Sequence, residues 1–338
     1  MESRRLFMLT EPPQLEIRHQ PIEVQAARIK DWFIRNGHDM VVPPRYKAKE
    51  MAKAWNVEKL EPNEHSDLAV ETSALRNSLI NEVTKSVREN KPFAVIHRDS
   101  DRLKQANDDI GHWFGNISIR RSACELTNIL EKIMIEKEIQ LKAAVFVPSK
   151  STDEVTAAIF GDEKDINILL SEFAKYEEKP IRVPGYDYDF SSTTSYIKST
   201  DEKLSDLLKD TQERLAKEGD IDQAKSLWYE AVDIAQRNAH EAKDQKILKN
   251  IPPLVDLMRM ERGQFDNIIG KVFNGTRPDT KVGGMKKMLD VLHSKFFGSD
   301  SPIYRKWNVE LINGGLEKLE EIYERVFPKE NIPVTNNV

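Results

Sequence analysis

The chain has 338 residues, of which 39% are hydrophobic and 32% are charged, and its formal net charge is -5. This composition is sufficient for about two or three domains with buried cores, while the acidic balance disfavours a general nucleic-acid coat protein. A single cysteine excludes a disulfide framework and a thiolate metal cluster, and no segment approaches the roughly twenty apolar residues of a membrane span, so we expect a cytoplasmic protein without membrane contact.

Residues 1–65 are predicted to form a small α/β module. The segment "LFML" resembles a short strand, and "EVQAARIKDWFIRNG" has helical spacing and ends in a glycine. A proline-bearing segment, "VVPPRYKAKEMAKAW", follows. We interpret this module as a cap or a partner-binding element.

Strand and helix patterns alternate over residues 66–222. The helical "ETSALRNSLINEVTKSVREN" leads to the strand "FAVIH", and a helix over roughly 117–137 leads to the strand "KAAVFV". The polar turn "PSKSTDE" then joins "KAAVFV" to "VTAAIF", which predicts a hairpin. The helical "DEKLSDLLKDTQERLAKEG" ends the region. The alternation predicts an α/β sheet domain covered by helices.

Residues 223–338 show only helical patterns, separated by Gly, Pro and Asn, and are predicted to form an all-helical assembly or regulatory domain. Within it, residues 259–306 carry ten Lys or Arg against five acidic residues. This local excess favours a protein or nucleic-acid partner, although solvated helix faces often give the same count.

The stretch "FAVIHRDSDRLKQANDD" joins a hydrophobic strand to a polar helix. Asp99 lies at the carboxyl end of the strand, and Lys104 and Asn107 share one face of the helix. Asp153 and Glu154 lie in the predicted hairpin turn. If the two strands are neighbours, the carboxylates converge with an ammonium and an amide, which is typical of a site for a divalent cation and a nucleoside triphosphate.

A simpler interpretation of the same acids is helix capping. Acidic and hydroxyl side chains after a strand are often helix N-caps, and Ser100 or Asp101 could have that role here. Spacing alone does not decide between a cap and a cation site.

The segment "HRDSDRLKQANDDIGHWFGN" resembles the signature of GGDEF domains, the diguanylate cyclases, whose usual form is close to "D-x-D-x-F-K-x-x-N-D-x-x-G-H-x-x-G-D". The match runs without a gap from Asp99 to Asn116, and "STDEV" stands where that family has its GGDEF hairpin. The resemblance covers about residues 66–222. It implies a GGDEF/palm-type, ferredoxin-like sheet domain, followed here by the all-helical domain, and a nucleotidyltransferase activity.

The resemblance also implies roles for individual residues. Catalytic acids correspond to Asp99, Asp153 and Glu154, and the metal contacts to Asp99, the backbone of Ser100, and Asp153. The implied nucleotide contacts are Lys104 and Lys217 for the triphosphate, with Asn107 and Asn116 for the base. The implied cofactor is Mg²⁺ or Mn²⁺, and the implied substrates are ATP, GTP or both.

Two departures from the family pattern bear on activity. Ser151 and Thr152 replace the two glycines of the hairpin, which let phosphate approach the backbone closely. Asn116 stands where the family has a guanine-reading aspartate, and this weakens the preference for guanine unless Asn116 only caps a helix beginning near Ile117.

Two functions remain open. The first is a divergent GGDEF/palm nucleotidyltransferase that makes a cyclic di- or oligonucleotide second messenger by two-metal catalysis. Because each palm supplies one bound triphosphate, ring closure then implies a homo-oligomer. The second is a catalytically degenerate palm that acts as a nucleotide-binding sensor or scaffold.

Overall fold

The structure is a computed structural model that describes residues 20–38, 40–149, 153–176, 181–183, 186, 189–217, 221–273, 280–299 and 301–328. Contacts divide the chain into two compact units, Met1–Ala242 and Lys243–Val338. The predicted strand at "LFML" and the residues Ser151 and Thr152 lie outside the described part.

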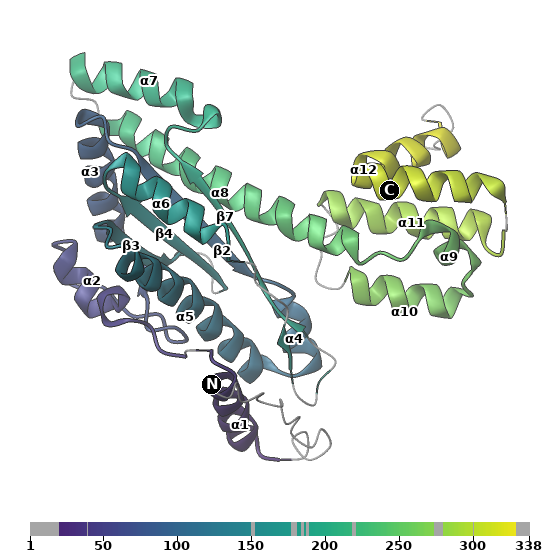
Figure 1. Cartoon of the computed structure of the whole chain (residues 1–338). Coiled ribbons are helices and arrows are strands. Elements are labelled where there is room, and N and C mark those ends of the chain that lie inside the picture. The colour runs from purple at the N-terminus through teal and green to yellow at the C-terminus, as the bar shows by residue number, and fades with distance from the viewer. Residues whose placement is uncertain are drawn as a thin grey trace, which may run out of the picture. The chain divides into compact units, whose positions relative to one another are not determined.

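The first unit is built on a five-stranded sheet with the strand order β1-β3-β4-β2-β7 (Figure 1). The strands are β1 (Ala69–Val70), β2 (Phe93–Ser100), β3 (Lys142–Val147), β4 (Glu154–Phe160) and β7 (Ser192–Lys198). Only the short β1 is parallel to its neighbour, β3; the other pairs are antiparallel. The pairing of β3 with β4 confirms the predicted hairpin strands.

Along the chain the central elements follow the order β2-α5-β3-β4-α6-β7. This βαββαβ order, with β2 and β4 in the middle of the sheet, is the ferredoxin-like arrangement. The predicted fold class, an α/β palm-type sheet domain followed by helices, is therefore confirmed.

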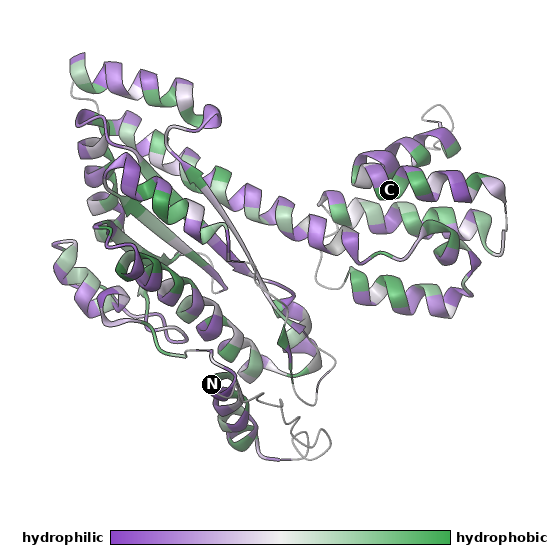
Figure 2. Cartoon of the chain, viewed as in Figure 1, coloured by the Kyte–Doolittle hydropathy of each residue, from purple (hydrophilic) through white to green (hydrophobic). Residues whose placement is uncertain are grey.

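Helices cover both faces of the sheet because side chains alternate along its buried strands. Ala94 and Ile96 face the core under α5 (His112–Glu136) and α6 (Glu163–Phe173). Phe93 and Val95 face the opposite core, which contains side chains of α3 (Ser73–Arg88), α7 (Glu202–Lys217) and α8 (Ile221–Lys249). In Figure 2 green, hydrophobic residues on the central strands and on the covering helices are interspersed with purple, hydrophilic ones.

The amino-terminal segments pack onto this unit in two places. Side chains of η2 (Pro44–Tyr46) and α2 (Ala48–Ala54) enter the two cores of the sheet. Helix α1 (Ile22–Arg35) forms a smaller core with α5 and with the two-stranded β5 (Ile181–Arg182) and β6 (Asp189–Phe190). The separate module predicted for residues 1–65 stays a prediction.

Helix α8 lies along one face of the sheet through a continuous stripe of buried residues. The stripe comprises Ala224, Leu227, Trp228, Ala231, Ile234 and Ala235. Trp228 contacts the ring of Phe93, with 6.4 Å between centroids, and the Ser195 hydroxyl donates to the main-chain oxygen of Ala235. The predicted domain boundary between residues 222 and 223 falls inside this helix. The division into three domains therefore stays a prediction.

Only helices occur in the described residues of the second unit after α8. They are α9 (Leu254–Arg259), α10 (Arg262–Val272), α11 (Lys281–Phe296) and α12 (Pro302–Val326). Their core includes Leu257, Phe265, Leu289 and Tyr304. Among the described helices of the whole chain, none combines the length and the apolar character that a membrane crossing needs.

Candidate functional site

The strand register brings two carboxylates together at one end of the sheet. Asp99, near the end of β2, is the cross-strand partner of Glu154, the first residue of β4. The two side chains share the sheet face on which α8 packs, because directly opposed residues point to the same side. Asp99 is 5% exposed, whereas the Glu154 side chain is 17% exposed. This acid pair is thus largely sheltered from solvent.

Helix α8 supplies two polar side chains to the acid pair. Gln236 Nε2 donates to Glu154 Oε1 at 3.2 Å, and His240 Nε2 lies 3.9 Å from the same oxygen and 4.0 Å from Asp99 Oδ2. Sequence reasoning missed both residues, because it assigned residues 223–338 to a separate domain. The only indication in the sequence is that Gln236 and His240 are four residues apart, and so share one face of a helix, beside its apolar stripe.

His97 lies beneath the acid pair. It is 1% exposed, its Nδ1 shares a hydrogen bond with Thr156 Oγ1 at 3.2 Å, and its Nε2 lies 4.0 Å from Glu154 Oε2 without a hydrogen-bond partner. Burial lowers the pKa of His97 to about 4, against the opposing charge of Glu154. His97 is therefore neutral at pH 7.

Glu154 is ionised in this setting. Burial raises its pKa, but hydrogen bonds from His240 and Gln236 and the nearby imidazoles outweigh burial, so the pKa of Glu154 lies below its ordinary value. Because His97 is neutral at pH 7, we assign the stabilisation of the carboxylate at that pH to the two residues of α8. The carboxylate of Glu154 can thus present charged oxygens to a cation.

The end of β2 is fixed from the opposite sheet face by Arg98. Its guanidinium donates to Glu125 and to the hydroxyls of Ser122 and Thr194, the latter at 2.9 Å. Glu125 also binds Arg121 at 2.8 Å. Burial raises the pKa of Glu125, but the charges of the two arginines hold it below its ordinary value. This buried ion network holds the strand segment that carries Asp99.

Asp101 has a structural role. Its carboxylate accepts hydrogen bonds from the hydroxyls of Ser191 at 2.7 Å and Thr193 at 2.6 Å. The N-cap position of α4 (Leu103–Asp109) is Arg102, in the left-handed region at φ 55°. The capping interpretation is therefore wrong in placing the N-cap at Ser100 or Asp101.

The predicted nucleotide-binding residues on α4 and α5 are near one another. Lys104 is exposed on α4, and the buried Oδ1 of Asn107, one turn later, has no hydrogen-bond partner. Asn116 is exposed in the second turn of α5. The alternative that Asn116 caps this helix is wrong, since α5 begins at His112 and its N-cap is Gly111.

Gly115 is packed against the amide of Asn107. A Cβ at Gly115 would lie 2.0 Å from Asn107 Oδ1, so we expect Gly115→Ala to displace that amide. Loss of one oriented polar contact predicts nucleoside triphosphate binding weaker by on the order of tenfold, with a smaller change in stability. Titration calorimetry and thermal unfolding measure the two effects. The matched control is Gly263→Ala, because a Cβ there meets no atom within 4 Å; equal losses of binding in both variants would contradict the prediction.

Of two further predicted site residues, Lys217 stands apart from the acid pair and Asp153 adjoins it. Lys217 ends α7, which packs on α3, and its ammonium lies 3.6 Å from Glu213. The structure thus does not bring Lys217 to the acid pair. Asp153 lies just before β4, where its main-chain oxygen accepts from the Ser100 N–H at 3.4 Å. The roles predicted for Lys217, Asp153 and Ser100 stay predictions.

The acid pair supplies only part of the ligand set that a divalent cation needs. Carboxylate oxygens suit Mg²⁺ and Mn²⁺, and Asp99 and Glu154 supply them side by side. The orphaned Nε2 of His97 adds an unsatisfied buried donor atom at the same place. Within the described residues, however, no three or more His, Cys, Asp or Glu side chains are already gathered closely enough to hold a metal.

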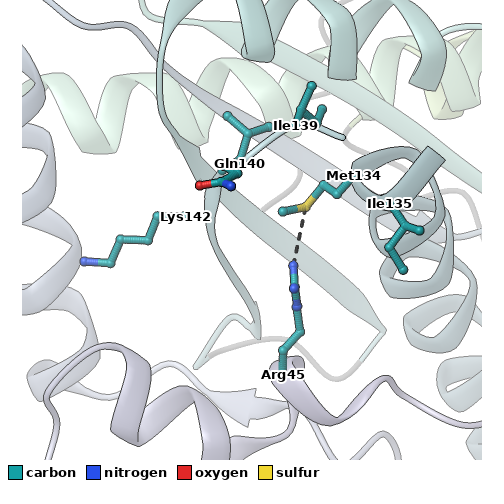
Figure 3. A pocket seen from close by; sticks show the side chains of 7 residues that line it. Arg45, Met134, Ile135, Ile139, Gln140 and Lys142 are labelled. Atoms are coloured by element: carbon teal, nitrogen blue, oxygen red, sulfur yellow. Dashed lines mark hydrogen bonds between the residues drawn. The ribbon is translucent and has the colours of Figure 1, made fainter. Parts of the chain in front are cut away.

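A shallow pocket of about 390 Å³ lies elsewhere on the first unit (Figure 3). Its lining includes Arg45, Met134 and Lys142, and Arg45 donates to the Met134 sulfur at 3.8 Å. Lys142 begins β3 and pairs with Phe160, the last residue of β4, whereas Glu154 is the first. The pocket therefore lies at the end of the hairpin opposite to the acid pair, and we assign it no part in the chemistry.

No family model and no curated protein sequence matches the chain. Among solved structures, a sensory box/GGDEF family protein from Caulobacter crescentus is 18% identical, with 54% of this chain and 99% of that chain covered and a TM-score of 0.32. The FimX GGDEF domain from Pseudomonas aeruginosa is 15% identical, with coverages of 49% and 94% and a TM-score of 0.30. The GGDEF domain of DgcB from Caulobacter crescentus, in complex with c-di-GMP, is 13% identical, with coverages of 45% and 90% and a TM-score of 0.29. These structural neighbours are GGDEF domains, the family that the sequence resembles.

Proposed function

We propose that this chain is a divergent GGDEF-like nucleotidyltransferase that joins nucleoside triphosphates into a cyclic di- or oligonucleotide. The observation that carries the proposal is the cross-strand pair of Asp99 and Glu154, followed on the next helix by Lys104 and Asn107. Two acids for a cation, an ammonium for phosphate and an amide for a base thus come from one end of β2 and β4 and from the adjacent helix.

The residues have distinct tasks in the proposed reaction. Asp99 and Glu154 hold the cation, with Asp153 and the Ser100 backbone as further candidate contacts, while Lys104 binds the triphosphate and Asn107 orients the base. A bound Mg²⁺ or Mn²⁺ supplies charge that lowers the pKa of the attacking 3′-hydroxyl and stabilises the leaving pyrophosphate. The 3′ oxygen forms a bond to the α-phosphorus while the bond to pyrophosphate breaks.

Ring closure needs a second nucleotide held in the opposite sense. Since one palm presents one α-phosphate, we propose that two copies of the chain act together in a homo-oligomer. A cytoplasmic setting and a partner at the basic residues 259–306 belong to the same proposal. Both ATP and GTP are candidate substrates.

The second candidate function is a nucleotide-binding sensor or scaffold without turnover. Its support is the replacement of the two hairpin glycines by Ser151 and Thr152, which hinders close approach of phosphate to the backbone. The two candidates differ in one measurable product, which is pyrophosphate.

The test is to incubate the full chain with each of the four nucleoside triphosphates, labelled at the α-phosphate, in Mg²⁺ and in Mn²⁺. We expect cation-dependent release of pyrophosphate from ATP, GTP or their mixture. Nucleotide binding without any pyrophosphate release would contradict the nucleotidyltransferase and favour the sensor or scaffold.

Base preference depends on Asn116 in this proposal. An amide can donate to adenine N1 or accept from guanine N1, whereas a carboxylate only accepts and so favours guanine. We therefore expect ATP to be a competent substrate, and Asn116→Asp to shift the ATP-to-GTP ratio toward GTP by on the order of tenfold, the cost of one mispaired polar group. Competition assays with both nucleotides measure the ratio. Identical ratios in the two proteins would contradict a base-reading role.

A further inference from the structure

Helix α8 covers the acid pair. The side chains of Asp99 and Glu154 are only 7% and 17% exposed. Gln236 Nε2 donates to both oxygens of Glu154, at 3.2 and 3.4 Å. His240 Nε2 lies within 4.0 Å of both carboxylates, and the His240 side chain is 51% exposed. The amide therefore holds the carboxylate of Glu154, while the imidazole lies between the acid pair and solvent.

The proposed reaction needs more access to the acid pair than this arrangement gives. Mg²⁺ binds an octahedral shell of oxygens, and in nucleotide sites the triphosphate and water supply several of them beside one or two carboxylates. A carboxylate that joins such a shell must face a space large enough for the triphosphate. Asp99 and Glu154 face Gln236 and His240 instead. The segment of α8 that carries these two residues must therefore move before the reaction begins.

This segment of α8 has little apolar anchoring. The continuous buried stripe of the helix ends at Ala235, and Ala239 is the last buried residue among the α8 side chains that the structure describes. The segment "QRNAHEA", residues 236–242, is otherwise mostly polar. Segments with few buried apolar contacts open locally at a low cost in free energy. Residues 236–242 can therefore leave the sheet while the apolar stripe stays in place.

We propose that residues 236–242 are an autoinhibitory cover, which must leave the acid pair before a cation and a nucleotide bind there. The inference rests on the proposed function and deepens it by naming how the same site is regulated. The cover lies outside residues 66–222, so the family resemblance does not imply it. Because α8 continues into the second unit, which begins at Lys243, a partner that binds the second unit can act on the cover through this helix.

The test compares the full wild-type chain with the double variant Gln236→Ala/His240→Ala. Titration calorimetry measures the binding of ATP and GTP analogues with a non-hydrolysable bridge between the α- and β-phosphates, in Mn²⁺. The apparent affinity of a site that is open part of the time is reduced by the open fraction. Loss of the polar contacts of the cover raises that fraction, so we expect the double variant to bind more tightly by on the order of tenfold.

Hydrogen exchange of the wild-type chain gives a second readout that does not depend on turnover. We expect the amides of residues 236–242 to exchange faster once Mn²⁺ and the analogue are bound, because the cover has left the sheet. The amides of residues 224–235, which include the apolar stripe, should keep their exchange rates. Slower exchange over residues 236–242 in the bound state would contradict the cover.

The control is Gln245→Ala, which removes an exposed glutamine of the same helix beyond the cover and should leave the affinity unchanged. If the wild type binds the analogue and the double variant binds it equally or more weakly, the cover is wrong; weaker binding would mean that α8 positions Glu154 for the cation. This failure differs from failure of the proposed function, in which neither protein binds either analogue in Mn²⁺. That result would overturn the proposed function and the cover together.

Discussion

Asp99→Ala is expected to abolish cation-dependent pyrophosphate release, a loss on the order of 10³-fold in turnover, while the protein remains folded. The carboxylate of Asp99 lies beside that of Glu154, so its removal takes away one of the acids that we propose to hold the cation. The substitution removes no side chain of the hydrophobic core, so we expect the protein to remain folded. The measurement is pyrophosphate release at saturating nucleotide and cation, with thermal unfolding of the same preparation.

Two further variants make this result specific. Asp31→Ala removes a carboxylate of the α1 surface, where it pairs with Arg35, and should leave turnover unchanged. Asp153→Ala tests the second predicted ligand and should act as Asp99→Ala does. Full turnover in both Asp99→Ala and Asp153→Ala would overturn the assignment of the acids to a cation.

Glu125→Gln is expected to lower the free energy of unfolding at pH 7 by about 3–5 kcal/mol, the usual cost of leaving a buried charge without its partner. The change keeps the shape of the side chain but removes the charge opposite Arg98 and Arg121, which are 3% and 2% exposed. Urea unfolding measures the difference. The control is Glu50→Gln, which breaks an exposed pair with Lys53 on α2 and should matter little.

The same network predicts a pH dependence. The pKa of Glu125 is lowered in the folded protein, so its contribution to stability is complete above the unfolded value of about 4.3 and is lost as the pH falls through the folded value. We therefore expect the stability difference between wild type and Glu125→Gln to shrink below about pH 4. A difference that stays constant from pH 7 into that range would contradict the ionised Glu125.

Much of the sheet could be predicted from the sequence because its signals are local. The apolar run before Asp99 predicts β2, and the polar turn before "VTAAIF" predicts the hairpin of β3 and β4. The pairing of β2 with β4 then follows from the ferredoxin-like resemblance, and it places Glu154 opposite Asp99. Helix boundaries were less accurate: α5 begins at His112, whereas the spacing predicts a start near residue 117.

The rest of the candidate site depends on long-range packing that no local pattern encodes. In the sequence, nothing distinguishes His97 from other residues of a buried strand, and nothing distinguishes His240 from the many other polar residues of a helical region. They meet at Glu154 because α8 packs on the sheet, where Trp228 contacts Phe93. These two residues are 135 positions apart in the sequence. The ion network of Glu125 likewise cannot be predicted from the sequence, because Glu125 on α5 meets Arg98 only when α5 packs against β2.

The most direct test of the central claim is the chemical form of the product. The full chain is incubated with α-labelled ATP and GTP in the presence of Mn²⁺, and the products are treated with phosphatase before chromatography and mass spectrometry. Our account predicts a product that resists phosphatase, because a cyclic nucleotide has no terminal phosphate, and that is missing from the Asp99→Ala reaction. Nucleotide that is bound but recovered unchanged, or products that phosphatase degrades completely, would contradict it.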